Sequence, residues 1–266
     1  LAIYGVIFLG QKIPETERVA SGVSYKGMMM AVGAPFTIII SMTLMILLAT
    51  KVINFPDGWM YLALIGLVSL ISILEAKLIH KEKAIFPIMF SLMLLTSATE
   101  LVTNQWVNAL LGGAVESAIL LLALISTIMA LGRFFAGQLV HRINPVGVLL
   151  MSSIFAALGI YVLSFVTSSG LTIVGAILFA IGITYFWPTM LGFCSEYIPR
   201  TGALGLSLLG GAGFVSASMF MPVMGKILEE NDTSVALQSV GILPILMIIG
   251  FSALFVIYRK KKPEVL

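Results

Sequence analysis

The sequence predicts an all-α polytopic membrane protein, and three observations lead to that prediction. Of its 266 residues, 59% are hydrophobic and only 10% are charged, a balance far from that of soluble globular domains. The mean hydropathy is +1.10. The apolar residues gather in runs of about 20, the length that an α-helix needs to cross a bilayer.

These runs divide the chain into five parts. Residues 1–10 are apolar but too short to span, which predicts the end of a truncated transmembrane helix, so we expect the chain to be a fragment. A cytoplasmic linker at 11–27, an additional helix pair at 28–83, a six-helix bundle at 84–258 and a basic tail at 259–266 follow. The eight complete spans that we expect are Met28–Thr50, Trp59–Ile79, Ala84–Leu111, Ala118–Val140, Val146–Val166, Leu171–Phe193, Ala203–Ile227 and Val235–Tyr258.

The basic residues predict the orientation of these spans. Cytoplasmic loops carry an excess of Lys and Arg, and here thirteen of the fifteen fall on one side of the alternating loops. The C-terminus is therefore expected on the cytoplasmic side. We expect the protein in the inner or plasma membrane of the cell. The thirteen are Lys12, Arg18, Lys26, Lys77, Lys81, Lys83, Arg133, Arg142, Arg200, Arg259, Lys260, Lys261 and Lys262, against Lys51 and Lys226.

The span at 84–111 places an acidic residue, Glu100, near its midpoint. A charged side chain there costs at least about 2.5–3.5 kcal/mol, so a functional role is the default interpretation. At helical spacing Ser97, Asn104 and Asn108 share its face. This polar stripe predicts a face toward a water-filled path or toward other protein. The alternative is that a protonated Glu100 only holds a neighbouring helix by a hydrogen bond.

A second irregular stretch is IGITYFWPTM at 181–190. Pro188 has no backbone N–H, so it releases the carbonyl of Thr184 from helical bonding. Released groups at membrane depth are tolerated where they are buried in protein or line a cavity. Tyr185 and Trp187 could stack on a ligand there, although aromatic residues near the end of a span are more often interface anchors.

Two further features admit two interpretations each. The run at 203–225 is rich in Gly, Ala and Ser, which predicts either tight structural packing or a helix that slides against a partner. Arg133 and Glu196 lie near cytoplasmic span ends, so we expect them to pair, in a network with Arg142 and Arg200 that latches one state. The alternative is that each charge is simply solvated.

Several motifs resemble the major facilitator superfamily. In GRFFAGQLVHRINP, the residues Gly132, Arg133, Gly137 and Arg142 resemble its repeated loop signature. The stretch GITYFWPTMLGFCSEYIPRTGALGLSLLGGAG is similar to its tenth and eleventh helices. TELVTNQWV resembles the seventh helix of its fucose permease-like sugar-symporter branch. The resemblance covers roughly residues 85–258, which would be the C-terminal half.

The chain departs from that family in two respects. The additional pair at 28–83 lies where the family has only a cytoplasmic loop. Apart from ten residues, the N-terminal half is missing, and with it the acids associated with proton coupling in fucose permease-like proteins. Glu100 is therefore a candidate coupling group by its own position only.

The resemblance implies secondary active transport of a small polar solute, such as a sugar, coupled to protons by alternating access. The expected partners are this solute, protons, the lipid bilayer and the missing N-terminal half. The residues expected to bind the solute are Glu100, Asn104, Asn108, Gln105, Trp106, Tyr185 and Trp187, and those expected to gate access are Arg133, Arg142, Glu196 and Arg200.

Two other classes of function remain as alternatives. A structural or accessory membrane subunit would account for the additional helix pair but not for a buried Glu100. An intramembrane enzyme would need a nucleophile with a base, paired carboxylates or a metal at depth, and the sequence has neither GxSxG nor HExxH. Cys194 is the single cysteine and the two histidines lie far apart. We therefore predict no enzyme activity, no metal or other cofactor and no nucleic-acid partner.

The orientation leads to a first prediction. Cysteines introduced at Ser117 and Ser168 should react with a membrane-impermeant thiol reagent added outside intact cells, because both lie in loops expected on the outer side. Reaction only after the membrane is permeabilised would reverse the predicted topology.

Overall fold

The computed structural model describes residues 22–49, 58–79, 84–104, 118–165 and 168–260, and within these ranges it contains helices and no strand. The elements in chain order are α3 (Tyr25–Ala31), α4 (Pro35–Ala49), α5 (Gly58–Leu74), the π-helix η1 (Glu75–Ile79), α6 (Ile85–Ser97), the π-helix η2 (Ala98–Val102), α8 (Ala118–Phe134), α9 (Ala136–Ile143), α10 (Pro145–Ser164), α11 (Ser169–Thr184), α12 (Phe186–Tyr197), the 3₁₀ helix η3 (Pro199–Thr201), α13 (Gly202–Glu230) and α14 (Thr233–Tyr258).

The helices confirm a multi-pass membrane protein. Five helical stretches of the described chain are long and apolar enough to cross a bilayer, or six if the bent pair α3 and α4 forms one span. They are 60–78, 145–164, 169–197, 199–230 and 233–258. Two shorter apolar helices run over 85–101 and 119–134.

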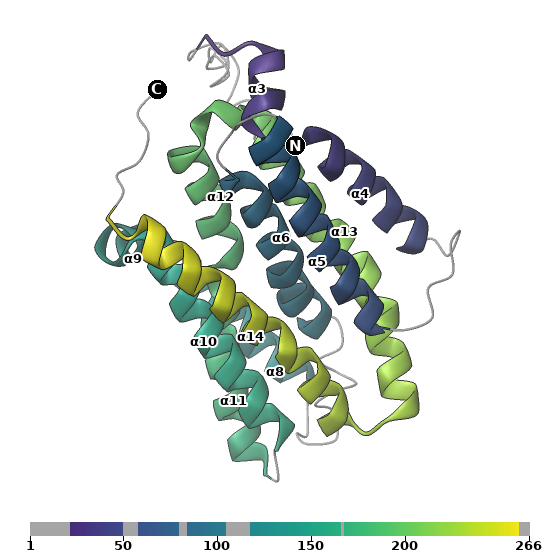
Figure 1. The fold of residues 1–266 in the computed structure, drawn as a ribbon. Coiled ribbons are helices and arrows are strands. Elements are labelled where there is room, and N and C mark those ends of the chain that lie inside the picture. Colours follow the sequence, from purple (N-terminus) through teal and green to yellow (C-terminus); the bar gives the residue numbers. More distant parts are fainter. Residues whose placement is uncertain (1–21, 50–57, 80–83, 105–117, 166–167, 261–266) are drawn as a thin grey trace, which may run out of the picture.

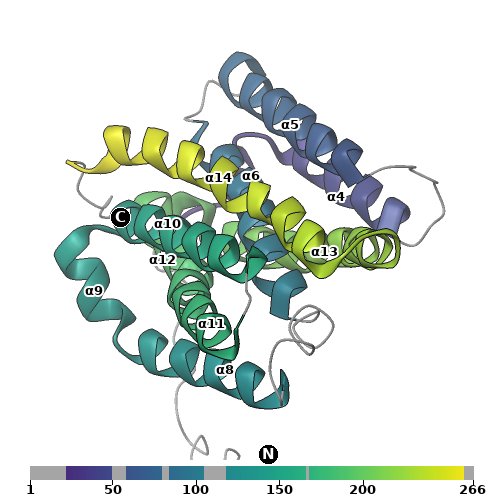
Figure 2. The ribbon, with the colours of Figure 1, turned by 90° about the horizontal axis from the view of Figure 1, so that it is seen from below.

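Helix α6 lies at the centre of the described structure. It packs against α5, α12, α13 and α14, and nearly every one of its side chains is buried. Figure 1 shows α4 and α5 along one flank of α6 and the group of α8, α10 and α11 toward the other. In Figure 2 α5 lies at one edge of the molecule, α8 and α9 lie at the opposite edge, and α6 lies between them. A helix so enclosed can carry polar groups that lipid would not tolerate.

Three predicted spans differ in detail from the structure. The run Met28–Thr50 is two helices that meet at 76°, because Gly33 takes φ +80° in the turn before Pro35. The run Ala118–Val140 ends at Phe134, after which α9 begins as a separate helix. The run Leu171–Phe193 contains a break between α11 and α12. The remaining described spans agree with their apolar runs within a few residues, except Ala84–Leu111, which is described only to residue 104.

The bend between α3 and α4 is stabilised by a buried acidic residue that the sequence analysis did not single out. The carboxylate of Glu75 accepts hydrogen bonds from the backbone N–H groups of Phe36 at 3.2 Å and Thr37 at 2.9 Å, and from the Thr37 hydroxyl. Pro35 has no N–H to satisfy. Glu75, at the end of α5, therefore caps the first turn of α4 and joins the two helices into a hairpin.

The loop before α10 explains why INP ends one helix and begins another. Asn144 has φ +82°, a conformation that Asn tolerates better than most residues. Its side chain accepts a hydrogen bond from the backbone N–H of Val146 at 3.0 Å, and Pro145 occupies the first helical position. This is the usual chemistry of a helix N-terminus.

Helices α10 and α11 approach each other through glycine. A Cβ added at Gly182 would clash with the backbone nitrogen of Ala156, and one added at Gly159 would clash with that of Phe179. Such contacts let two helix backbones pack closely inside a membrane. A larger residue at either glycine must push the helices apart.

This close packing yields a second prediction. Gly182→Ala should lower the free energy of unfolding by about 1–3 kcal/mol, the usual cost of overpacking. Chemical unfolding in mixed micelles measures it. The control is Gly170→Ala on the same helix, where an added Cβ meets nothing within 4 Å and stability should be unchanged or slightly raised. Equal effects at both positions would contradict the assigned contact.

Candidate functional site: a buried polar centre on α6 and η2

The break between α11 and α12 leaves one backbone carbonyl for other use. Pro188 cannot donate to the carbonyl of Thr184, as the sequence predicts. In the structure, Nε of Arg133 donates to this carbonyl oxygen at 3.0 Å. The side chain of Arg133, at the end of α8, thus replaces the missing helical hydrogen bond and ties α8 to the break.

The same arginine also binds Glu100. Its Nη2 donates to Glu100 Oε1 at 2.8 Å, with 4% of the glutamate side chain and 39% of the arginine side chain exposed. An arginine presents several donors in a fixed plane, so one guanidinium can serve a carbonyl and a carboxylate together. A group from each of three segments, α8, η2 and α11, meets at this point.

Glu100 lies in the π-helix η2 (Ala98–Val102). A π-helical turn has i→i+5 bonding and occurs mostly as a single turn, frequently at functional sites. The polar stripe was predicted from α-helical spacing, so its register changes across this turn. Ser97 of the stripe is buried, as are the neighbouring threonines Thr96, Thr99 and Thr103.

Several buried polar atoms of the described residues have no hydrogen-bond partner among those residues. They come from α6, η2, the two residues that follow η2, and α12, and they include the second carboxylate oxygen of Glu100. An unsatisfied buried group of this kind costs about 1–3 kcal/mol, so native proteins keep few of them. The atoms are Ser97 Oγ, Glu100 Oε2, Thr103 Oγ1, Asn104 Oδ1, Trp187 Nε1 and Thr189 Oγ1.

Side chains of α6 and α12 meet at a glycine of α13. A Cβ added at Gly213 would lie 2.6 Å from the ring carbon Cζ2 of Trp187 and 2.7 Å from Oγ of Ser97. The ring of Trp187 also packs edge-on against Phe214, with ring centroids 5.6 Å apart. The hydroxyl of Ser97 and the ring of Trp187 therefore both contact α13 where it lacks a side chain.

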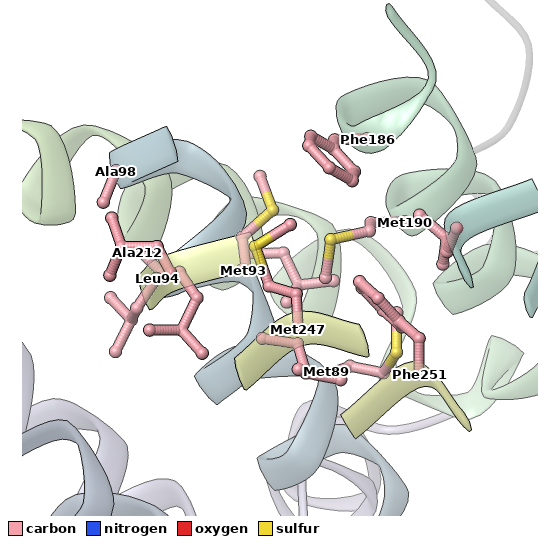
Figure 3. Close-up of a cluster of buried hydrophobic side chains, with 14 of the residues drawn as sticks. Met89, Met93, Leu94, Ala98, Phe186, Met190, Ala212, Met247 and Phe251 are labelled. Atoms are coloured by element: carbon pink, nitrogen blue, oxygen red, sulfur yellow. The ribbon is translucent and has the colours of Figure 1, made fainter. Parts of the chain in front are cut away.

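The core beside this polar centre is rich in methionine. Met89 and Met93 on α6, Met190 on α12 and Met247 on α14 are fully buried, and Figure 3 shows their side chains converging with Phe186 and Phe251. The hydroxyl of Thr96 donates to the sulfur of Met190 at 3.4 Å, and that of Thr99 to the sulfur of Met247 at 3.6 Å. Methionine fills irregular space and adapts to changes in packing.

The structure places the predicted solute-binding residues unevenly. Glu100 and Asn104 belong to the polar centre, and Trp187 contributes its indole N–H to it. The Tyr185 hydroxyl lies 3.2 Å from the position of a Cβ added at Gly132, next to Arg133 in the chain. Gln105, Trp106 and Asn108 lie outside the described residues.

The structure places the predicted gating residues apart. Arg133 pairs with Glu100 and donates to the carbonyl of Thr184. The gating role of these residues stays a prediction. Arg142, Glu196 and Arg200 are exposed. Within the described part of the chain no ion pair joins these three.

Sequence reasoning missed the hydroxyl groups that complete the centre. Thr189 contributes a buried hydroxyl on α12. Ser216 on α13 donates to the backbone carbonyl of Leu94 on α6. The small-residue pattern of α13 predicted close packing but could not indicate which serine would face α6.

Comparison with known proteins adds no assignment, since no family model, curated protein or solved structure matches this chain. Within the described residues no group of three or more His, Cys, Asp or Glu side chains is placed to hold a metal ion. The chemistry of the site therefore consists of one acid, one guanidinium, an amide, hydroxyls and an indole N–H. Such groups can bind a polar molecule and can exchange a proton.

The ion pair yields a third prediction. Arg133→Gln should destabilise the protein by about 2 kcal/mol, less than the 3–5 kcal/mol typical of a fully buried pair because Arg133 is partly exposed. The double variant Glu100→Gln, Arg133→Gln should lose about 1 kcal/mol less than the sum of the single variants. Chemical unfolding of all four proteins measures this coupling.

The exposed Arg200→Gln serves as the control and should leave stability within about 0.5 kcal/mol. Purely additive losses at Glu100 and Arg133 would mean that the two side chains do not interact in the folded protein.

Proposed function

We propose that this membrane protein is a secondary active transporter of a small polar solute, coupled to protons. The observation that carries the proposal is that Glu100 is buried and bound through one oxygen to Arg133, while its other oxygen and several buried polar atoms of α6 and α12 have no partner among the described residues. Intramembrane ionisable groups generally mark pathways for ions or substrates.

The solute-binding role rests on the donors and acceptors in this centre. Asn104 offers an acceptor, Ser97, Thr103 and Thr189 offer hydroxyls, and Trp187 offers an indole N–H. Hydroxyl-rich molecules such as sugars need such mixed donors and acceptors. The flat ring of Trp187 adds an apolar face against which a sugar or other ring could pack.

The coupling role rests on Glu100 and its partner. When Glu100 carries a proton it no longer needs the full positive charge of Arg133, and the bond between η2 and α8 weakens. Arg133 also holds the Thr184 carbonyl, so a change at Glu100 reaches the break between α11 and α12 through one side chain. The methionine-rich core offers packing that can adapt as these helices shift. This provides a two-state element of the kind that alternating access requires.

The resemblance of the motifs at 85–258 to the major facilitator superfamily agrees with this proposal, and the sugar-symporter branch is the one that we favour. A structural or accessory subunit is the second candidate. The Arg133–Glu100 ion pair favours it, because a buried ion pair can also serve only to fix how helices pack. The two candidates differ in what the removal of the Glu100 charge does to transport.

The fourth prediction separates them. Glu100→Gln keeps the shape and the acceptor toward Arg133 but cannot release a proton. In vesicles that contain the full-length protein, it should abolish proton-driven accumulation of the transported solute while sparing solute exchange at equilibrium. Radiolabelled L-fucose, D-galactose and D-glucose are the first solutes to test, with and without an imposed proton gradient.

The matched control is Glu229→Gln, an exposed acid at the end of α13, which should accumulate solute as the parent does. Accumulation by Glu100→Gln at the parental level would remove Glu100 as the coupling group. Absence of both accumulation and exchange for every solute with the parent protein would favour the structural subunit.

A further inference from the structure

Helices α5 and α14 leave a groove between them on the surface of α6. Each of the two packs against α6, and they do not pack closely against one another. The groove has a volume of about 350 Å³, within the size range of ligand sites in proteins. It lies between the helix pair at 28–83 and the helices that carry the polar centre, and it is separate from that centre.

The walls of the groove are almost entirely apolar. Leu62, Ile65 and Ile73 line it from α5, Ile88 and Leu92 from α6, and Leu246 from α14. Gly66 makes room on the α5 side, because a Cβ added there would meet nothing within 4 Å.

The two hydroxyl groups in the groove are already satisfied. Ser91 donates to the backbone carbonyl of Pro87 at 2.9 Å, and Ser69 donates to Ser91 Oγ at 2.7 Å. Both hydroxyl protons are therefore used within the protein. A polar ligand would lose its hydrogen bonds with water and gain few here, so the groove suits a hydrocarbon chain.

The residues that follow the groove carry positive charge. Lys77 is exposed and comes four residues after Ile73, at the end of the same helical stretch. In the sequence His80, Lys81 and Lys83 follow it. Basic clusters next to a transmembrane helix attract anionic lipid head groups.

We propose that this groove binds one acyl chain of an anionic phospholipid, with the phosphate of its head group beside Lys77. The groove lies on membrane-spanning helices, which are surrounded by lipid chains, so a lipid can enter it without leaving the bilayer. The lipid chain fills the space between α5 and α14 and thereby joins the helix pair at 28–83 to the rest of the protein.

Photolabelling of the full-length protein in lipid vesicles tests this proposal. The probes are phosphatidylglycerol and phosphatidylcholine, each with a diazirine near the end of one acyl chain, added separately to phosphatidylcholine vesicles. We expect the phosphatidylglycerol probe to label peptides of α5 and α6 at the groove. Gly66→Leu fills the groove and should reduce this labelling several-fold. Lys77→Gln should reduce the preference for phosphatidylglycerol about fivefold, the factor expected for one basic residue near an anionic surface.

The control for Gly66→Leu is Leu67→Phe. Leu67 is the next residue of α5, is 54% exposed and does not line the groove, so its enlargement should leave labelling unchanged. Equal labelling in Gly66→Leu and the parent would mean that the probe reports only the lipid that surrounds any membrane protein, and the site would be refuted. Equal labelling by the two probes in the parent would refute the role of the anionic head group.

Discussion

The guanidinium group of Arg133 connects three segments: α8, which carries it, η2 and the end of α11. Without this contact each segment would need another partner for its polar group, because lipid offers none. The guanidinium pairs with the carboxylate of Glu100 on η2, and it donates to the Thr184 carbonyl the hydrogen bond that Pro188 cannot donate. Unpaired, each of these groups would cost several kcal/mol at membrane depth. The end of α8, the π-turn after α6 and the break after α11 are therefore fixed by the same contact, and none of them can move without the other two.

The residues around that contact argue against a purely structural role for it. A pair whose only task is to hold helices together is best when every neighbouring polar atom is satisfied. Among the described residues, the second oxygen of Glu100 and the buried polar atoms of Ser97, Asn104 and Trp187 have no hydrogen-bond partner. For packing alone, apolar residues in place of Glu100 and Arg133 would serve as well, because replacement of buried ion pairs by apolar residues is often stabilising. The retained polarity is consistent with the proposed binding role.

Hydropathy alone predicted the helical class and the approximate limits of most described spans, since membrane depth permits little else. Proline chemistry predicted the free carbonyl of Thr184, because that consequence is local. The partner of Arg133 could not be predicted, since loop charges give only a coarse depth for a long side chain. The bend after α3 was not predicted, although Gly33 and Pro35 are residues that favour a turn, because the long apolar run around them was interpreted as one span. Glu75 was missed because it falls within the predicted span Trp59–Ile79, and its partners in α4 are distant in the sequence.

The cap that Glu75 provides has a consequence for how the chain is made. The N–H groups that open α4 find their acceptor in a residue that the ribosome adds almost forty positions later. Until then these donors must stay with water or with the machinery that inserts the chain, because lipid offers no acceptor. The N-terminal turn of α4 therefore gains this acceptor only once Glu75 has been made, and the hydrogen bonds that close it couple the insertion of α4 to that of α5.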